Sequence, residues 1–321
     1  MPTPTFPGRL STSRAIIGAI QQAIETDNSE AWIARVYSEV LRSDQEVEDY
    51  AWIGETPKMR EWIGGRQAVG LSESNYSLRN KHFEATIRIP VAWLRRDKTG
   101  QIRQRISGLS MANTEHWADL GAALIEAGES ARCYDGQYFF DTDHPDPSTS
   151  DVATQSNDVT YDVVAPTAPT AAEMSAAIIY AIKTLLAVKS AKGRKLNAAA
   201  RRFVLRVGLD LMAPAAAALG NTVIADTVSV TNTLITLGTL GGFQVELWVD
   251  PRATWTDRFA LFRADGQNPA LVRQEEQGLQ IKAQAEGSPL EFDEDAHEYG
   301  LDAWRNGGYG FWESAVLVTL T

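Results

Sequence analysis

The segment "HFEATIRI", residues 82 to 89, alternates strictly between apolar and polar side chains and constrains the fold more than any other stretch. Its apolar residues share one face of a strand and its polar residues share the other. The preceding text, from residue 66, predicts one or two more strands with a turn near residues 72 to 75. No predicted helix lies near enough in sequence to cover this hairpin. An isolated chain would therefore expose unpaired strand edges, and the fold has to cover or pair them.

A second apolar surface without an obvious neighbour lies near the N-terminus. Ser11 to Thr26 is predicted to be a helix that Thr12 or Ser13 can cap. Its isoleucines form one stripe at helical spacing, namely Ile16, Ile17, Ile20 and Ile24. The stripe must be buried against some other element.

The remaining elements predict the α+β class, with two main bodies plus an extended arm and hairpin. Gln101 to Ser130 is the longest predicted helix, with Gly128 near its natural stop. A Ser/Thr/Pro-rich stretch at residues 146 to 170 marks an internal boundary, and a strongly apolar helix follows at Ala171 to Val188. After these come a strand in "RRFVLRVGLDL", a short helix in "APAAAAL", and strands in "TVSVTNTLITLG" and "FQVELWVDP". The closing third is rich in strands.

The net charge of −11 argues against nucleic acid as a tightly held ligand, because neutralising phosphates requires a basic surface. Two local basic clusters are either solvated or in contact with an acidic partner or neighbouring subunit: Arg95, Arg96, Lys98, Arg103 and Arg105, then Lys189, Lys192, Arg194 and Lys195. The acidic run "EFDEDAHE", residues 291 to 298, is either a solvated loop or a cation site.

A single cysteine excludes an intramolecular disulfide and a cysteine-based zinc cage. The first residues lack the apolar core of a secretory signal. The best membrane candidate, "AAIIYAIKTLLAV", is short and interrupted by Lys183. These features predict a soluble protein made inside the cell, with no membrane partner.

The stretch "CYDGQYFFDTDHP", Cys133 to Pro145, is the strongest candidate for chemistry. A metal-dependent hydrolase could be built on Asp141, Asp143 and His144. In an extended chain, however, the two aspartates share one face while His144 points to the other. Two carboxylates alone are a poor metal site, and the other histidines are isolated in sequence. Asp135-Gly136 is also a preferred centre for a two-residue hairpin turn, so we interpret this stretch as architecture.

Other catalytic templates are missing from the sequence: there is no phosphate loop, no Gly-x-Gly-x-x-Gly and no Gly-x-Ser-x-Gly. We therefore expect no enzymatic activity, no catalytic or metal-ligating residues and no cofactor.

Four separated blocks resemble the major head subunits of phage Mu and Mu-like prophages. They are "YAWIGETPKMREWIGGR", "NYSLRNKHFEATIRI", "CYDGQYFFDTDHP" and the closing "EYGLDAWRNGGYGFWESAV". The middle of the chain is similar as well, up to the strand that ends in "LWVDP". One departure is the basic stretch "IPVAWLRRDKTGQ", where relatives usually carry a more acidic one.

The resemblance implies the Hong Kong 97 type of capsid fold. Residues 1–45 would form an N-terminal arm and residues 46–90 an extended β-hairpin loop. Residues 91–164 and 251–321 would form a peripheral domain whose spine helix spans about residues 101–130, and residues 165–250 an axial domain. The arm and the loop would each find their partner on a neighbouring subunit. The implied intersubunit contact residues are Ile16, Ile20, Trp52, Arg60, Glu61 and Trp62.

The implied function is assembly into pentamers and hexamers that form an icosahedral shell around the double-stranded DNA of a tailed phage. Implied partners are other copies of the chain, a scaffold, a portal, a maturation protease, a decoration protein and packaged DNA without sequence-specific binding. The protein would belong to the virion and assemble in the cytoplasm of the bacterial host. A non-viral compartment shell of the same fold remains an alternative, as does the hydrolase on Asp141, Asp143 and His144.

Overall fold

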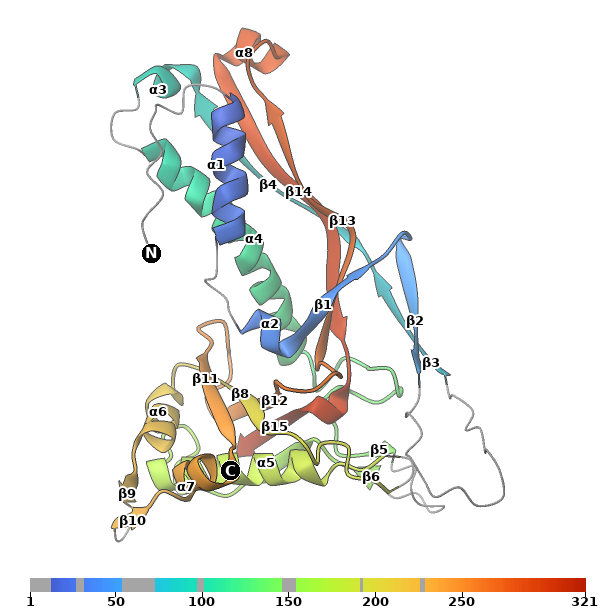
Figure 1. The fold of residues 1–321 in the computed structure, drawn as a ribbon, viewed down its shortest axis with the longest axis vertical. Coiled ribbons are helices and arrows are strands. Elements are labelled where there is room, and N and C mark those ends of the chain that lie inside the picture. The colour runs from blue at the N-terminus through green and yellow to red at the C-terminus, as the bar shows by residue number, and fades with distance from the viewer. Residues whose placement is uncertain are drawn as a thin grey trace.

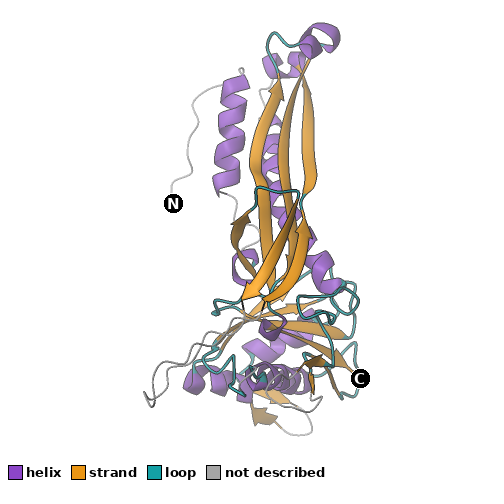
Figure 2. Ribbon diagram, turned by 90° about the vertical axis from the view of Figure 1, so that its right-hand side faces the viewer, coloured by secondary structure: helices purple, strands orange, loops and turns teal. Residues whose placement is uncertain are grey.

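An elongated upper body and a lower body are joined end to end in the computed structural model (Figures 1 and 2). The structure describes residues 13–26, 32–53, 73–96, 101–145, 154–190, 193–225 and 229–321. Helices and strands occur in both bodies, which confirms the α+β class. Among the described helices, none is both long enough and apolar enough to cross a lipid bilayer.

The upper body is a four-stranded sheet in the order β1-β13-β14-β4 with helices along one side (Figure 1). Its strands are β1 (Tyr37–Arg42), β4 (Lys81–Pro90), β13 (Leu271–Gln284) and β14 (Ala296–Tyr309). The strand predicted from "HFEATIRI" is confirmed, and β14 pairs with it from Ala296↔Pro90 to Arg305↔Lys81. Residues 81–90 therefore pair within this sheet. The edge that the sequence left unpaired is covered by β14.

The helices of the upper body pack on one another through apolar stripes. The spine helix is confirmed as α4 (Gln101–Glu126), and α1 (Ser13–Thr26) lies alongside it. Ile16 and Ile20 are fully buried in a cluster with Ile106 and Leu109 of α4. The expectation that these two isoleucines find their partner on a neighbouring subunit is corrected, because the chain itself buries them. Two short helices, α3 (Val91–Arg96) and α8 (Pro289–Glu294), lie at the far end of the body (Figure 1).

A two-stranded hairpin leaves the junction of the two bodies. β2 (Val47–Ile53) and β3 (Glu73–Arg79) pair antiparallel from Val47↔Arg79 to Ile53↔Glu73. A short helix α2 (Ile33–Val36) precedes β1. Tyr50 anchors the hairpin base by donating a 2.6 Å hydrogen bond to Gln274 of β13. Residues 54–72, which follow β2, lie outside the described part of the chain.

The lower body is a five-stranded sheet in the order β11-β8-β12-β15-β7, covered by α5 (Ala171–Ala187). Its strands are β7 (Asp158–Tyr161), β8 (Arg202–Val207), β11 (Gln244–Val249), β12 (Arg258–Arg263) and β15 (Ala315–Leu320). Smaller elements are β5 (His144–Pro145), β6 (Thr154–Gln155), α6 (Met212–Gly220), β9 (Val223–Ala225), β10 (Ser229–Thr231), α7 (Thr233–Gly241) and the 3₁₀ turn Trp312–Ser314.

One predicted strand is wrong. Residues 233–241 form the helix α7, whereas the sequence "TVSVTNTLITLG" predicts a strand throughout. Asn232 caps the helix, because its side-chain oxygen accepts from the N–H of Leu234 at 3.1 Å. Gly242 ends it in the left-handed conformation, with φ of 69°. These two caps override the β-branched residues between them.

Candidate functional sites

The stretch Cys133 to Pro145 opens with a tight turn after α4. The N–H of Gly136 donates to the oxygen of Cys133 at 3.1 Å, and the N–H of Cys133 donates to the oxygen of Gln137 at 2.8 Å. Gly136 has a φ of 87°, whereas Asp135 stays outside the left-handed region. The loop therefore has three residues, which corrects the two-residue turn expected at Asp135-Gly136. The positive φ expected at Gly136 is confirmed.

His144 is fully buried, and both of its ring nitrogens face acceptors. Nδ1 lies 2.7 Å from Oδ2 of Asp135, and Nε2 lies 3.1 Å from Oδ1 of Asn157. The Asn157 amide is oriented by its Nδ2, which donates to the oxygen of Phe139 at 2.8 Å. The imidazole stacks on Trp312 with ring centroids 3.8 Å apart. Each ring nitrogen thus has a hydrogen-bond partner, and the network ties three distant segments together.

Cys133 completes the network by donating from Sγ to Oδ1 of Asp135 at 2.9 Å. Burial, and then the negative charge of Asp135, raise the pKa of the Cys133 thiol far above its usual range. Burial on its own would raise the pKa of Asp135, but hydrogen bonds from His144 and Cys133 hold it below the usual range.

Cys133, Asp135 and His144 bring possible ligand atoms within 4.8 Å of one another, so they are the residues that could hold a metal ion. A zinc site or a nucleophile needs a thiolate, however, and the environment of Cys133 opposes one. Each ligand atom is also already hydrogen-bonded within the network. The cluster therefore fits a structural role better than a catalytic one.

Asp141 and Asp143, the carboxylates of the hydrolase alternative, do not converge on His144. Asp141 accepts from the N–H groups of Tyr138 at 3.1 Å and Thr142 at 2.7 Å. Burial raises the pKa of Asp141, but hydrogen bonds from Asp143 and from these N–H groups lower it overall. The hydrogen bond with Asp141 raises the pKa of Asp143. Since both nitrogens of His144 are engaged elsewhere, these three residues do not form the centre that the hydrolase alternative requires.

The two bodies are joined by ion pairs at the C-terminal end of α4. Acidic side chains are unfavourable there because the helix dipole is negative at that end. Arginines of the lower body offset this repulsion. Arg252 donates to Asp119 at 2.6 Å, Arg258 pairs with Glu129, and Arg206 Nη1 lies 2.9 Å from Glu126 Oε1.

Arg206 is the centre of this junction and is fully buried in β8. Its Nε donates to Oδ2 of Asp250 at 2.8 Å, and the Asp250 side chain is also fully buried. The guanidinium lies 4.8 Å from the ring centroid of Trp255 and 5.5 Å from that of Trp248. A buried charge is tolerated only when it is paired and hydrogen-bonded, so this cluster fixes the lower sheet against α4.

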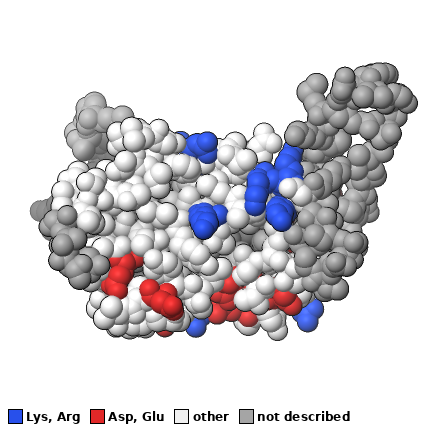
Figure 3. All heavy atoms as spheres, turned by 90° about the horizontal axis from the view of Figure 1, so that it is seen from below, with Lys and Arg blue, Asp and Glu red and all other residues white. Residues whose placement is uncertain are grey.

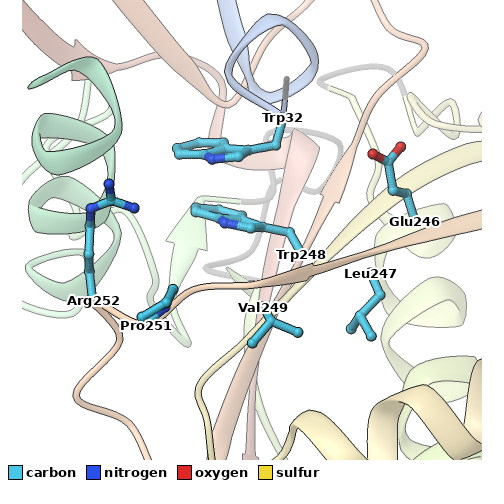
Figure 4. A pocket seen from close by; sticks show the side chains of 7 residues that line it. All are labelled: Trp32, Glu246, Leu247, Trp248, Val249, Pro251 and Arg252. Atoms are coloured by element: carbon cyan, nitrogen blue, oxygen red, sulfur yellow. The ribbon is translucent and has the colours of Figure 1, made fainter. Parts of the chain in front are cut away.

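A hollow of about 610 Å³ lies beside the junction, along the edge strand β11 (Figure 4). Trp32, which precedes α2, stacks on Trp248 of β11 with ring centroids 3.6 Å apart. Arg35 of α2 forms an ion pair with Glu246. The hollow is lined by Trp32, Glu246, Leu247, Trp248, Val249, Pro251 and Arg252. It therefore combines an aromatic wall with charged groups at its rim.

The outer edge of β11 is unpaired within the described part of the chain. The N–H of Gln244 donates to the oxygen of Arg201, just before β8, and the N–H of Asp250 donates to the oxygen of Val207 in β8. The peptide groups of the even-numbered residues of β11 therefore face β8. The peptide groups of Val245, Leu247 and Val249 consequently point outward. The β2–β3 hairpin leaves the molecule on the opposite flank (Figure 1). One flank thus presents a projecting hairpin, and the other a free strand edge beside a hollow.

The face seen from below is largely uncharged over its described part (Figure 3). Its basic side chains lie in small separate groups, and acidic side chains gather along one rim. Tight binding of nucleic acid requires an extended basic surface. This face does not provide one among the described residues.

Sequence and structure comparisons identify the relatives of this chain. The family model of the Mu-like prophage major head subunit gpT matches residues 15–168. Over this stretch the chain is similar to the Mu-like major head subunits. The Mu-like prophage FluMu major head subunit of Haemophilus influenzae is 37% identical over 106 residues, or 33% of this chain and 34% of the relative. The major capsid protein of Escherichia phage Mu is 31% identical over 106 residues, or 33% of this chain and 35% of the relative.

The matched part therefore spans about a third of the length of these curated relatives. A subunit of the procapsid of bacteriophage JBD30 superposes on 95% of this chain and 74% of its own length, with a TM-score of 0.52 and 21% identity. This likeness confirms the Hong Kong 97-like capsid fold that the sequence resemblance implied.

The predicted contact residues of the hairpin are untested by this structure. Trp52 lies in β2, opposite Ser74, and its side chain lies outside the described part. Arg60, Glu61 and Trp62 lie outside the described residues. The Arg206 junction does not follow from any of the sequence predictions. An arginine in the middle of the apolar run "RFVLRV" was its signal, because an unpaired charge cannot occupy such a position.

Proposed function

We propose that this chain is the major capsid protein of a tailed phage. Its copies assemble into pentamers and hexamers that form an icosahedral shell around double-stranded DNA. The observation that carries the proposal is that the two flanks of this capsid fold differ. One flank carries the projecting β2–β3 hairpin, and the other carries the free edge of β11. Surfaces that differ on two flanks give head-to-tail contacts, and such contacts form rings when the rotation from one copy to the next closes.

The proposed organisation changes the domain scheme implied by the resemblance in two places. Residues 81–90, which that scheme gave to the extended loop, pair within the upper sheet. The strands β7, β12 and β15, which it gave to the peripheral domain, lie in the lower sheet. The upper body acts as the peripheral domain, with α4 as its spine, and residues 165–250 supply most of the axial domain. The hairpin of residues 46–80 acts as the extended loop that lies across a neighbour, with Trp52, Arg60, Glu61 and Trp62 at that contact. Several weak contacts per subunit suffice, because their avidity multiplies in a closed shell.

We also propose the partners of such a shell, namely a scaffold, a portal, a maturation protease, a decoration protein and packaged DNA. The net charge of −11 supports a wall that does not trap DNA moving past it. The protein would be a virion component assembled in the host cytoplasm and would have no catalytic role.

The test is assembly of the purified chain, with and without a scaffold, followed by light scattering and electron microscopy. We expect closed particles built of rings. The variant Trp62→Ala should lower particle yield while the circular dichroism of unassembled subunits stays unchanged, since a large aromatic side chain is a typical interface anchor. A monomer at every concentration would refute the shell. Equal yields from both proteins would refute the assigned contact of the hairpin.

A further inference from the structure

Helix α8, at the far end of the upper body, exposes an aromatic side chain to solvent. Phe292 is 92% exposed, so it does not fold back on its own chain. Its neighbours Asp293 and Glu294 are also exposed. Glu294 pairs with Arg88, whereas Asp293 has no ion-pair partner among the described residues. A large apolar side chain beside an unpaired carboxylate is typical of a surface that binds a partner.

A hollow of about 200 Å³ lies at the same end, between α3 and the start of α4. Its wall combines cationic and apolar side chains, mainly those of Arg88, Ile89, Trp93, Arg96, Ile102 and Arg105. Trp93 is 54% exposed, and the Arg105 guanidinium lies 5.8 Å from the centre of its ring. No described carboxylate pairs with Arg96 or Arg105, whereas Arg88 is held by Glu294 and Glu298.

We propose that Phe292 and Asp293 of one copy enter this hollow on a second copy of the chain. The chemistry is complementary at each point. The Phe292 ring would lie against Trp93 and the Arg105 guanidinium, and the Asp293 carboxylate would pair with Arg96. The volume is sufficient, since an apolar cavity of about 150 Å³ holds one benzene ring. This inference rests on the proposed function, because it assigns one contact of the shell.

The position of the two surfaces determines what the contact builds. The knob, which is Phe292 and Asp293 of α8, and the hollow beside α3 are different surfaces, so a contact between them is head-to-tail. Both lie at the same tip of the elongated upper body (Figure 1). Copies that join through them bring their tips together, and each tip gives one knob and receives another. The result is a small closed ring of tips, separate from contacts made by the hairpin.

Disulfide cross-linking between two differently labelled chains tests this contact directly. Cys133 is buried, so an introduced cysteine is the reactive one. A Phe292→Cys chain mixed with a mass-tagged Trp93→Cys chain should give a cross-linked dimer of the two chains on mild oxidation of particles. The matched control replaces Trp93→Cys with Leu240→Cys. Leu240 is 83% exposed on α7 in the lower body and should give no such dimer.

Charge reversal gives a second, independent readout. Asp293→Arg should lower the association constant per contact about tenfold, equivalent to about 1.4 kcal/mol, and Arg96→Asp in the same chain should restore much of the yield. Particles that form no cross-link between position 292 of one chain and position 93 of another would overturn the contact but not the shell. Failure of Arg96→Asp to restore the particle yield would do the same.

If the wild-type chain forms no particles, the shell proposal fails, and the contact is then tested by cross-linking concentrated subunits. A cross-linked dimer under those conditions supports the contact, and the lack of one overturns it. The contact would also be overturned if another acidic protein bound the hollow and no cross-link formed between position 292 of one copy and position 93 of another.

Discussion

The substitution Ile20→Ala distinguishes an arm that is docked on its own subunit from one that waits for a neighbour. Ile20 is fully buried between α1 and α4. The change removes three carbon atoms, or about 2.4 kcal/mol of transfer free energy at about 0.8 kcal/mol each. The cavity left behind adds to this and brings the expected loss to about 2.5–5 kcal/mol. The population of subunits with α1 undocked should therefore rise about 30-fold or more.

Hydrogen exchange on unassembled subunits measures this change. The amides of residues 13–26 should lose protection in Ile20→Ala, because α1 packs mainly on α4 and can undock without unfolding the sheet. Gln21→Ala is the matched control, since Gln21 is exposed on the same helix and should change little. Wild-type protection in the Ile20→Ala subunit, combined with loss of particles, would refute intramolecular burial and restore the intersubunit assignment.

Three further predictions concern the junction, the buried network and the turn. Arg206→Leu should destabilise the subunit by about 3–5 kcal/mol, because the buried Asp250 carboxylate would keep only the more distant guanidinium of Arg252, 3.6 Å away. Adding Asp250→Asn should recover part of this loss in denaturant unfolding, and equal midpoints for wild type and the single variant would contradict the prediction. The pKa of Asp135 is lowered in the folded subunit, so its carboxylate adds to the free energy of unfolding above the ordinary carboxyl pKa of about 4. This stabilisation is lost as the pH falls through the lowered pKa. In thermal scans Asp135→Asn should therefore melt below wild type at pH 7, and the difference should disappear in acid. A deficit that grew in acid would have the wrong sign. Gly136→Val should lower the free energy of unfolding by about 1–2 kcal/mol or more, because a β-branched residue is strained at a φ of 87°. Steric clash adds nothing to this, since a β-carbon there would meet no atom within 4 Å. An unchanged melting temperature would contradict the prediction.

Elements with strong periodicity could be predicted from the sequence. The stripe through Ile16 and Ile20 located α1, and the alternation around Ile87 located β4. What these patterns cannot tell is the surface that each element meets. The stripe of α1 meets α4 of the same chain, although the sequence alone was equally compatible with a neighbour.

The candidate site shows the same limit in its side chains. The sequence grouped Asp141, Asp143 and His144 because they are adjacent. In the structure His144 bonds instead to Asp135, nine residues earlier, and to Asn157, which lies inside the boundary stretch of residues 146 to 170. The turn at Gly136 reverses the chain and brings Asp135 back to the imidazole. Local spacing therefore identified the right segment and the wrong partners.

The order of strands in the two sheets has a consequence for synthesis. β14 lies between β13 and β4 in the upper sheet, and β15 lies between β12 and β7 in the lower one. Both interior strands come from residues 296–320, whereas most of their neighbours are translated earlier. Neither sheet can complete its ladder until that segment has emerged from the ribosome. Nascent chains on one messenger would thus be unable to present completed sheets to one another, so native contacts between subunits would begin only with finished chains.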